Sequence, residues 1–151
     1  MIRPGRPEDA EVTARVHVDS WAAAYTLRGP TLEQRVELHR RFPATFVAEV
    51  DGEVVGFVTV GPCADDWAEG ELFAIYVRPE HWGTGVGRSL IEAGEQRLRE
   101  LALSDCILWV LDDNLRARRF YERAGWLPDG AAREIEFFGI QIPEVRYRKK
   151  L

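Results

Sequence analysis

The sequence predicts an α/β (α+β) fold with a mixed sheet, contained in a single domain that covers residues 1–151. Two observations support this prediction: segments with strand patterning alternate with segments with helical spacing along the chain, and one pair of strands is joined by a hairpin signal. The length of 151 residues is typical of one domain. The content of 46% hydrophobic and 30% charged residues is an ordinary globular balance, which argues against disorder.

The N-terminal segment predicts a short strand followed by two helices. The strand covers Ile2 to Arg6, and Pro7 with two following acidic residues then starts a helix. One semi-apolar face recurs at helical spacing, formed by Ala10, Thr13, Ala14, His17, Trp21 and Ala24. This helix should stop near Gly29-Pro30. Thr31 and Gln34 fit a capping box, so a second, short helix is expected to begin there and to end before Pro43.

Three strands are predicted next. TFVAEV and EVVGFVTVG are separated by Asp51-Gly52, a pair that suits the tight turn of a β-hairpin. The segment from Glu71 to Pro79 has apolar residues on both faces, which is typical of a central strand.

The rest of the chain predicts helix, strand, helix and two strands. GVGRSLIEAGEQRLRELAL has an amphipathic helical pattern, and Cys106 to Asp112 is a strand that is apolar on both sides. Asn114 is a plausible N-cap for a helix that ends at Gly125. Two weaker strands are expected, around Arg133 to Phe138 and around Pro143 to Lys149.

Composition and charge exclude several classes of function. The formal net charge of −5 disfavours nucleic-acid binding, which depends on neutralising phosphates, and suits a cationic substrate better. Cys63 and Cys106 lack the spacing of a zinc site, so no metal is expected. No apolar stretch approaches about 20 residues, and the start MIRPGRPEDA has no hydrophobic signal core. A cytoplasmic protein without membrane contact is therefore the expectation.

The segment most informative about function is YVRPEHWGTGVGRSL, in which a strand runs through a turn with Gly83, Gly85 and Gly87 directly into a helix. Glycines allow close backbone approach and positive φ, and the unpaired N–H groups of a first helical turn bind anions such as phosphate. A tight connection without any ligand is the alternative interpretation. The spacing matches neither the dinucleotide-binding GxGxxG nor the P-loop ending in Gly-Lys-Ser/Thr.

The run from Glu71 to Trp126 resembles the core of the GNAT superfamily of N-acetyltransferases. The turn Trp82-Gly83-Thr84-Gly85-Val86-Gly87 is similar to that family's glycine-rich signature, with Trp82 in place of the usual Arg or Gln. NLRARRFYERAGW is similar to its second signature. The resemblance implies a mostly antiparallel sheet of six to seven strands flanked by about four helices, in the order β-α-α-β-β-β-α-β-α-β-β.

The resemblance also implies that the chain binds acetyl-coenzyme A along a split sheet. The backbone of Ile75, Tyr76 and Val77 would pair with the pantetheine arm, and Asn114 would hydrogen-bond the cofactor near its reactive end. Main-chain amides of the turn would hold the pyrophosphate, contributed by Gly83, Thr84, Gly85, Val86, Gly87 and Arg88.

Two residues are candidates for the chemistry. An amine with a pKa of about 10.4 is almost fully protonated near pH 7, so acetyl transfer needs a base or a desolvating site. Glu71 matches a position where some GNAT members place a catalytic glutamate, although a solvated carboxylate at a strand end is the alternative. Asp65, Asp66 and Glu69 could share or replace its role. Tyr121 would protonate the leaving thiolate, with a core tyrosine as the alternative.

Other residues have weaker signals. Trp21, Tyr25 and Trp67 are candidates for the acceptor pocket, and an aromatic core explains them equally well. The histidines at positions 17, 39 and 81 lie in separate elements and are assigned no role, because isolated histidines are more often surface or packing residues.

The sequence therefore predicts an N-acetyltransferase that transfers an acetyl group from acetyl-coenzyme A to a primary amine by direct attack in a ternary complex. The amine could belong to a small molecule, a protein N-terminus or a lysine. The alternative is a non-catalytic acyl-coenzyme A sensor, which would have no chemical reason to retain Glu71 and Tyr121. Dimers are common in the family, so the resemblance also allows a homodimer.

Overall fold

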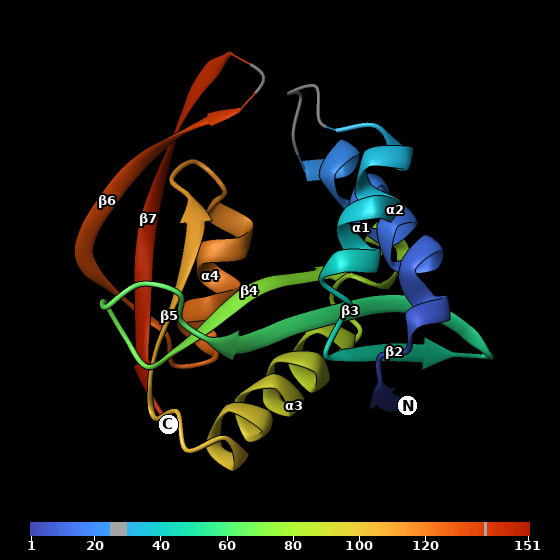
Figure 1. The fold of residues 1–151 in the computed structure, drawn as a ribbon, viewed down its shortest axis with the longest axis horizontal. Helices are drawn as coiled ribbons and strands as arrows, with labels where there is room; N and C mark the ends of the chain where they lie inside the picture. Colours follow the sequence, from blue (N-terminus) through green and yellow to red (C-terminus); the bar gives the residue numbers. More distant parts are fainter. Residues whose placement is uncertain (25–29, 138) are drawn as a thin grey trace. The chain divides into compact units, whose positions relative to one another are not determined.

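A computed structural model describes residues 1–24, 30–137 and 139–151 of the chain (Figure 1). In chain order the elements are β1 (Ile2–Pro4), the 3-10 turn η1 (Pro7–Asp9), α1 (Ala10–Ala24), α2 (Leu32–Arg41), β2 (Phe46–Val50), β3 (Glu53–Pro62), β4 (Gly70–Val77), the 3-10 turn η2 (Pro79–His81), α3 (Val86–Glu100), β5 (Asp105–Leu111), α4 (Leu115–Arg123), β6 (Leu127–Phe137) and β7 (Ile140–Lys150). This order of strands and α-helices is the predicted one.

The strands form a seven-stranded sheet in the order β1-β2-β3-β4-β5-β7-β6. β4 and β5 pair in parallel through Gly70 with Cys106 and Glu71 with Ile107. The pairs β1–β2, β2–β3, β5–β7 and β6–β7 are antiparallel. The prediction of a mixed, mostly antiparallel sheet with four helices and with β4 as a central strand is therefore confirmed.

The chain divides into two compact units. The first consists of residues 1–60 and 74–97, and the second of residues 61–73 and 98–151. The prediction of a single domain over residues 1–151 stays a prediction.

Local signals account for the elements of the first unit. The Thr31 hydroxyl accepts a hydrogen bond from the Gln34 amide at 3.2 Å, and the Gln34 side chain accepts one from the Thr31 amide at 2.9 Å, so the predicted capping box starts α2. Asp51 and Gly52 have φ angles of 51° and 80°, as a type I′ hairpin turn requires. The predicted end of the first helix near Gly29 lies outside the described residues.

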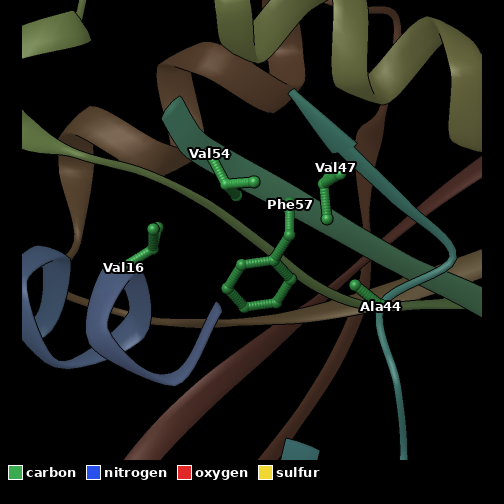
Figure 2. Close-up of a cluster of buried hydrophobic side chains, with 5 residues drawn as sticks. All are labelled: Val16, Ala44, Val47, Val54 and Phe57. Carbon is green, nitrogen blue, oxygen red and sulfur yellow. The ribbon is translucent and has the colours of Figure 1, made fainter. Parts of the chain in front are cut away.

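A cluster of buried side chains forms the core of the first unit. It joins α1, the segment before β2, and strands β2 and β3 (Figure 2), and consists of Val16, Ala44, Val47, Val54 and Phe57. Figure 2 shows the Phe57 ring lying between Val16 of α1 and Ala44. Val16, Val47 and Phe57 are fully buried, so burial of apolar surface fixes α1 against the β2–β3 hairpin.

The second unit contains longer terminal strands than predicted. β6 begins at Leu127, and its pairing with β7 is interrupted between Pro128 and Ala132. Asp129 sits in this irregular stretch, where its carboxylate accepts a hydrogen bond from the Ala131 amide at 3.0 Å. The prediction of a strand starting at Arg133 was therefore too short, because the turn-forming residues Pro128 to Gly130 are accommodated as a bulge inside a strand.

Candidate active site

The glycine turn of the first unit joins η2 to α3 and leaves its main-chain donors unused. Gly83 and Gly85 have φ angles of 75° and 93°, and a Cβ atom at either position would meet nothing within 4 Å. The first hydrogen bond of α3 runs from the Ser89 amide to the Gly85 carbonyl at 3.0 Å. Among the described residues, the amides from Gly83 to Arg88 have no acceptor. These donors lie at the positive end of a 15-residue helix, and unpaired amides at such a position are suited to an anion.

Trp82 attaches this turn to the end of β4. Its indole N–H donates to the Val77 carbonyl at 2.8 Å. The same carbonyl accepts a hydrogen bond from the Ser20 hydroxyl of α1, also at 2.8 Å. Both lone pairs of this oxygen are thus engaged. A pantetheine arm that pairs with Val77 would therefore have to accept a hydrogen bond from the Val77 amide N–H.

Glu71 lies in the second unit, near the start of β4, where it is half-buried. The Cys63 thiol donates to its carboxylate at 3.4 Å. Burial raises the pKa of Glu71, and the like charges of Asp65 and Glu144 act in the same direction. The Cys63 hydrogen bond and the Arg133 guanidinium oppose that rise in pKa. A carboxylate whose pKa lies above its ordinary value is a better general base near neutral pH.

An aromatic and cationic cluster accompanies Glu71 in the second unit. The Trp67 and Trp109 rings meet edge to face, with centroids 5.7 Å apart, and the Arg133 guanidinium lies 4.1 Å over Trp109. Arg133 also donates to Glu144 at 2.8 Å. The indole N–H of Trp109 is buried and has no hydrogen-bond partner within the described part of the chain. Trp67, a predicted acceptor residue, is thus accompanied by Trp109 and Arg133, which belong to β5 and β6 and were not singled out from the sequence.

The other acidic residues that precede β4 have mixed surroundings. One oxygen of Glu69 accepts hydrogen bonds from the Ser104 amide at 3.3 Å, the Ser104 hydroxyl at 2.9 Å and the Asp105 amide at 2.9 Å. Glu69 therefore fixes the start of β5 and is poorly placed to act as a base. Asp65 and Asp66 are exposed.

Tyr121 lies on α4 of the second unit, and Asn114 is the N-cap residue of that helix. The Asn114 side chain caps the helix, because its oxygen accepts a hydrogen bond from the Ala117 amide at 3.2 Å. Tyr121 is 8% exposed, and its ring centroid lies 5.5 Å from that of Phe120 and 6.3 Å from that of Tyr147. Its burial fits both a tyrosine that packs in the core and one whose hydroxyl serves as a proton donor.

Trp21, a predicted acceptor residue on α1, lies in the first unit. The Arg35 guanidinium of α2 lies 5.4 Å over the Trp21 ring. Tyr25 lies outside the described residues.

The structure also brings together two histidines that the sequence left without a role. His17 Nδ1 of α1 lies 3.2 Å from His39 Nε2 of α2, and His39 Nδ1 lies 3.1 Å from the Thr13 hydroxyl. The Tyr76 ring of β4 lies 4.1 Å from the His17 ring. This contact depends on how α1 packs against α2, which the sequence of neither helix alone predicts.

Residues 1–24, 30–137 and 139–151 contain no group of three His, Cys, Asp or Glu side chains that could hold a metal ion. The same ranges include no helix with the length and apolar character needed to cross a membrane.

Comparison with known proteins identifies the family. The pattern of the acetyltransferase (GNAT) family matches residues 13–126. YuaI of Bacillus subtilis strain 168, named as an uncharacterized N-acetyltransferase, is 30% identical over 158 residues, which cover 95% of this chain and 89% of the relative. The structure of Ard1 from Thermoplasma volcanium is similar with a TM-score of 0.78 at 26% identity, covering 100% of this chain and 97% of that one. The fold is also that of the PaiA N-acetyltransferase from Thermoplasma acidophilum, solved in complex with coenzyme A, with a TM-score of 0.75, 20% identity and coverage of 100% and 98%. The chain therefore belongs to the acetyltransferase (GNAT) family and is an acetyl-coenzyme A-dependent acyltransferase.

Proposed function

We propose that the protein transfers an acetyl group from acetyl-coenzyme A to the primary amine of an acceptor, by direct attack of the amine in a ternary complex. The observation that carries this proposal is the run of main-chain donors from Gly83 to Arg88, which have no acceptor among the described residues. Such a run is shaped for the diphosphate of coenzyme A, and the open space at Gly83 and Gly85 allows close approach.

Direct attack fits the cysteines better than an acyl-cysteine intermediate does. Burial raises the pKa of the Cys63 thiol, which disfavours the nucleophilic thiolate. Cys106 is fully buried, and its thiol donates to the Leu103 carbonyl at 3.2 Å. The acidic neighbours of Cys63, Asp65 and Glu71, also raise the pKa of its thiol and do not activate it for acyl transfer.

Glu71 takes the proton of the acceptor amine, directly or through a water, as the amine nitrogen attacks the thioester carbonyl. Its raised pKa suits this role, because a base acts best when its pKa is near the working pH. The tetrahedral intermediate then breaks its carbon–sulfur bond. The departing thiolate, whose conjugate thiol has a pKa of about 8.5, receives a proton from the Tyr121 hydroxyl.

The proposal is tested on purified protein in two steps. Calorimetric titration with acetyl-coenzyme A should give saturable binding. A panel of amines, including small primary amines, amino acids and peptides with free N-termini or lysines, is then monitored for acetyl-dependent release of free thiol. At least one amine should accelerate this release above the rate of hydrolysis, with the acetylated amine identified by mass spectrometry. Saturable binding without turnover on any amine would contradict acetyl transfer and would favour the sensor.

A further inference from the structure

Arg35 of α2 is a buried cation that has no counter-charge among the described residues. The residue is only 7% exposed, and its guanidinium packs over the Trp21 ring. Its Nη1 atom lies 3.4 Å from His17 Nδ1. Its Nε atom is buried and has no hydrogen-bond partner among the described residues.

No carboxylate of the described residues forms an ion pair with Arg35. Residues 25–29, which lie outside the described ranges, read YTLRG and contain neither Asp nor Glu. The α2 glutamate at position 37 lies 3.9 Å from Arg40 instead. The part of the chain between α1 and α2 therefore supplies no anion to this guanidinium.

The side chains around Arg35 are neutral or aromatic. Burial is the main cause that lowers the pKa of His17 to about 2 and that of His39 to about 4, and the positive charge of Arg35 lowers both further. Both imidazoles are thus uncharged near neutral pH, and the Tyr76 ring packs on His17. A guanidinium enclosed by such groups destabilises the folded chain unless an anion pairs with it.

We propose that Arg35 binds the carboxylate of the acceptor, so that the acceptor is a molecule with both an amine and a carboxylate, such as an amino acid or a short peptide with a free C-terminus. This inference rests on the proposed function, because it assigns the anion to the second reactant of the acetyl transfer. One planar guanidinium matches one carboxylate in charge and in bidentate geometry. A phosphate monoester, which carries nearly two negative charges at neutral pH, would call for a second cation beside Arg35. Trp21 provides an apolar surface beside the same group.

The test measures binding with probes that cannot be acetylated. N-acetyl-L-leucine, N-acetyl-L-phenylalanine and N-acetylglycine are titrated against the purified protein, each in comparison with its carboxamide, and inorganic phosphate is titrated alongside. At least one free acid should bind ten times or more tighter than its amide. In R35Q this preference should disappear. The control R40Q removes an exposed arginine of the same helix and should keep it.

A second variant and a stability measurement separate binding from folding. R35K keeps the positive charge but loses the planar guanidinium that can donate two parallel hydrogen bonds to a carboxylate. It should therefore fold and show a reduced preference for the acid. R35Q should be at least as resistant to urea as the wild type, because it removes an uncompensated buried charge. If R35Q fails to fold, the R35K result alone decides the matter.

Three results would overturn the inference: equal binding of acids and amides by the wild type, an unchanged preference in any Arg35 variant that folds, or Arg35-dependent binding of phosphate alone. Failure of the proposed function would give a different set of results. Without acetyl transfer to any amine, the carboxylate preference of the wild type and its loss in R35Q would still be measurable. With acetyl transfer and no such preference, only the assignment of Arg35 fails.

Discussion

Glu71 is a residue whose neighbours act on its pKa in opposite directions, and Cys63 is the neighbour that hydrogen-bonds to its carboxylate. The Cys63 thiol donates to the carboxylate and lowers its pKa against the effect of burial. We expect C63A to move the acidic limb of the kcat/KM profile to higher pH, because the carboxylate loses a donor. C63S keeps a donor and should leave the limb nearly in place.

The profile is measured from initial rates of thiol release between pH 5 and 9. E71Q provides the reference, since it should lower kcat/KM about a hundredfold and remove the limb altogether. A limb that stays at the same pH in C63A, or that persists in E71Q, would show that another group takes the proton.

Tyr121 is the residue assigned to protonate the leaving thiolate, and its hydroxyl can be removed with little change in packing. Y121F should lower kcat about a hundredfold while the dissociation constant for acetyl-coenzyme A stays within about twofold. Tyr147 gives a matched control in the same unit, because its hydroxyl donates to Glu122 at 3.0 Å and accepts from Arg118 at 3.0 Å. Y147F should lose stability and keep its turnover per folded molecule. Unchanged turnover in Y121F would make Tyr121 a core residue.

At the scale of residues, a local motif can mark a site candidate, whereas contacts between residues that are distant in sequence cannot be predicted from such a motif. The glycine turn and Asn114 stand in contiguous signatures, so their positions could be read directly. His17 and His39 are 22 residues apart, and their contact depends on how α1 packs against α2. Trp109 and Arg133 come together through the antiparallel pairing of β5, β7 and β6. No local pattern encodes such contacts, because each helix or strand has the same spacing whatever it packs against.

Among the elements, the turn between η2 and α3 depends on backbone geometry that only glycine adopts easily. G85A places a Cβ atom at a φ angle of 93° and in the space that a diphosphate would occupy. We expect this variant to lose about 1–2 kcal/mol of stability and to bind coenzyme A at least tenfold more weakly. Urea unfolding and calorimetric titration measure the two effects.

Gly52 in the β2–β3 hairpin is a control with the same kind of strain. Its φ angle is 80°, and an added Cβ atom would also meet nothing within 4 Å. G52A should therefore lose a similar amount of stability and bind coenzyme A normally. Equal weakening of binding in both variants would mean that the loss comes from destabilisation and not from the turn.

The bounds of a helix or strand were predicted accurately where residues close in sequence determine them, and less accurately where distant residues do. The capping box of Thr31 and Gln34 and the Asp51-Gly52 turn are complete within four residues, and both form as predicted. β6 was predicted too short because Pro128 and Asp129 are turn-forming residues by composition. Asp129 is held in the strand by distant partners, since its carboxylate accepts from Arg146 at 2.6 Å and from Arg148 at 3.2 Å.

For the whole molecule, the order of elements was enough to predict the fold class, because few topologies fit that order and the family signatures select one of them. The division into two compact units was not predicted. It depends on contacts between segments that are distant in sequence, such as residues 1–60 with 74–97.

The buried histidine pair makes the stability of the folded chain depend on pH. Burial holds the pKa of His17 at about 2 and that of His39 at about 4, below the ordinary value of 6.5, with Arg35 of α2 and Tyr76 of β4 packed nearby. Above pH 6.5 both histidines are neutral in the folded and the unfolded chain. As the pH falls below 6.5, both histidines become protonated in the unfolded chain but stay neutral in the folded chain. In the folded chain His39 becomes protonated only near pH 4 and His17 only near pH 2. Stability should therefore fall on acidification, by up to about 2 kcal/mol for each histidine between pH 7.5 and pH 5.

Urea unfolding followed by tryptophan fluorescence at half-unit steps of pH measures this loss. H39Q should remove about half of the slope of stability against pH. Glu71 acts in the opposite sense, because its raised pKa stabilises the folded chain as the pH falls, so the series is repeated in an E71Q background. A stability that stays level from pH 7.5 to pH 5 in that background would mean that His17 and His39 take up protons in the folded chain, and that their burial beside Arg35 does not keep them neutral.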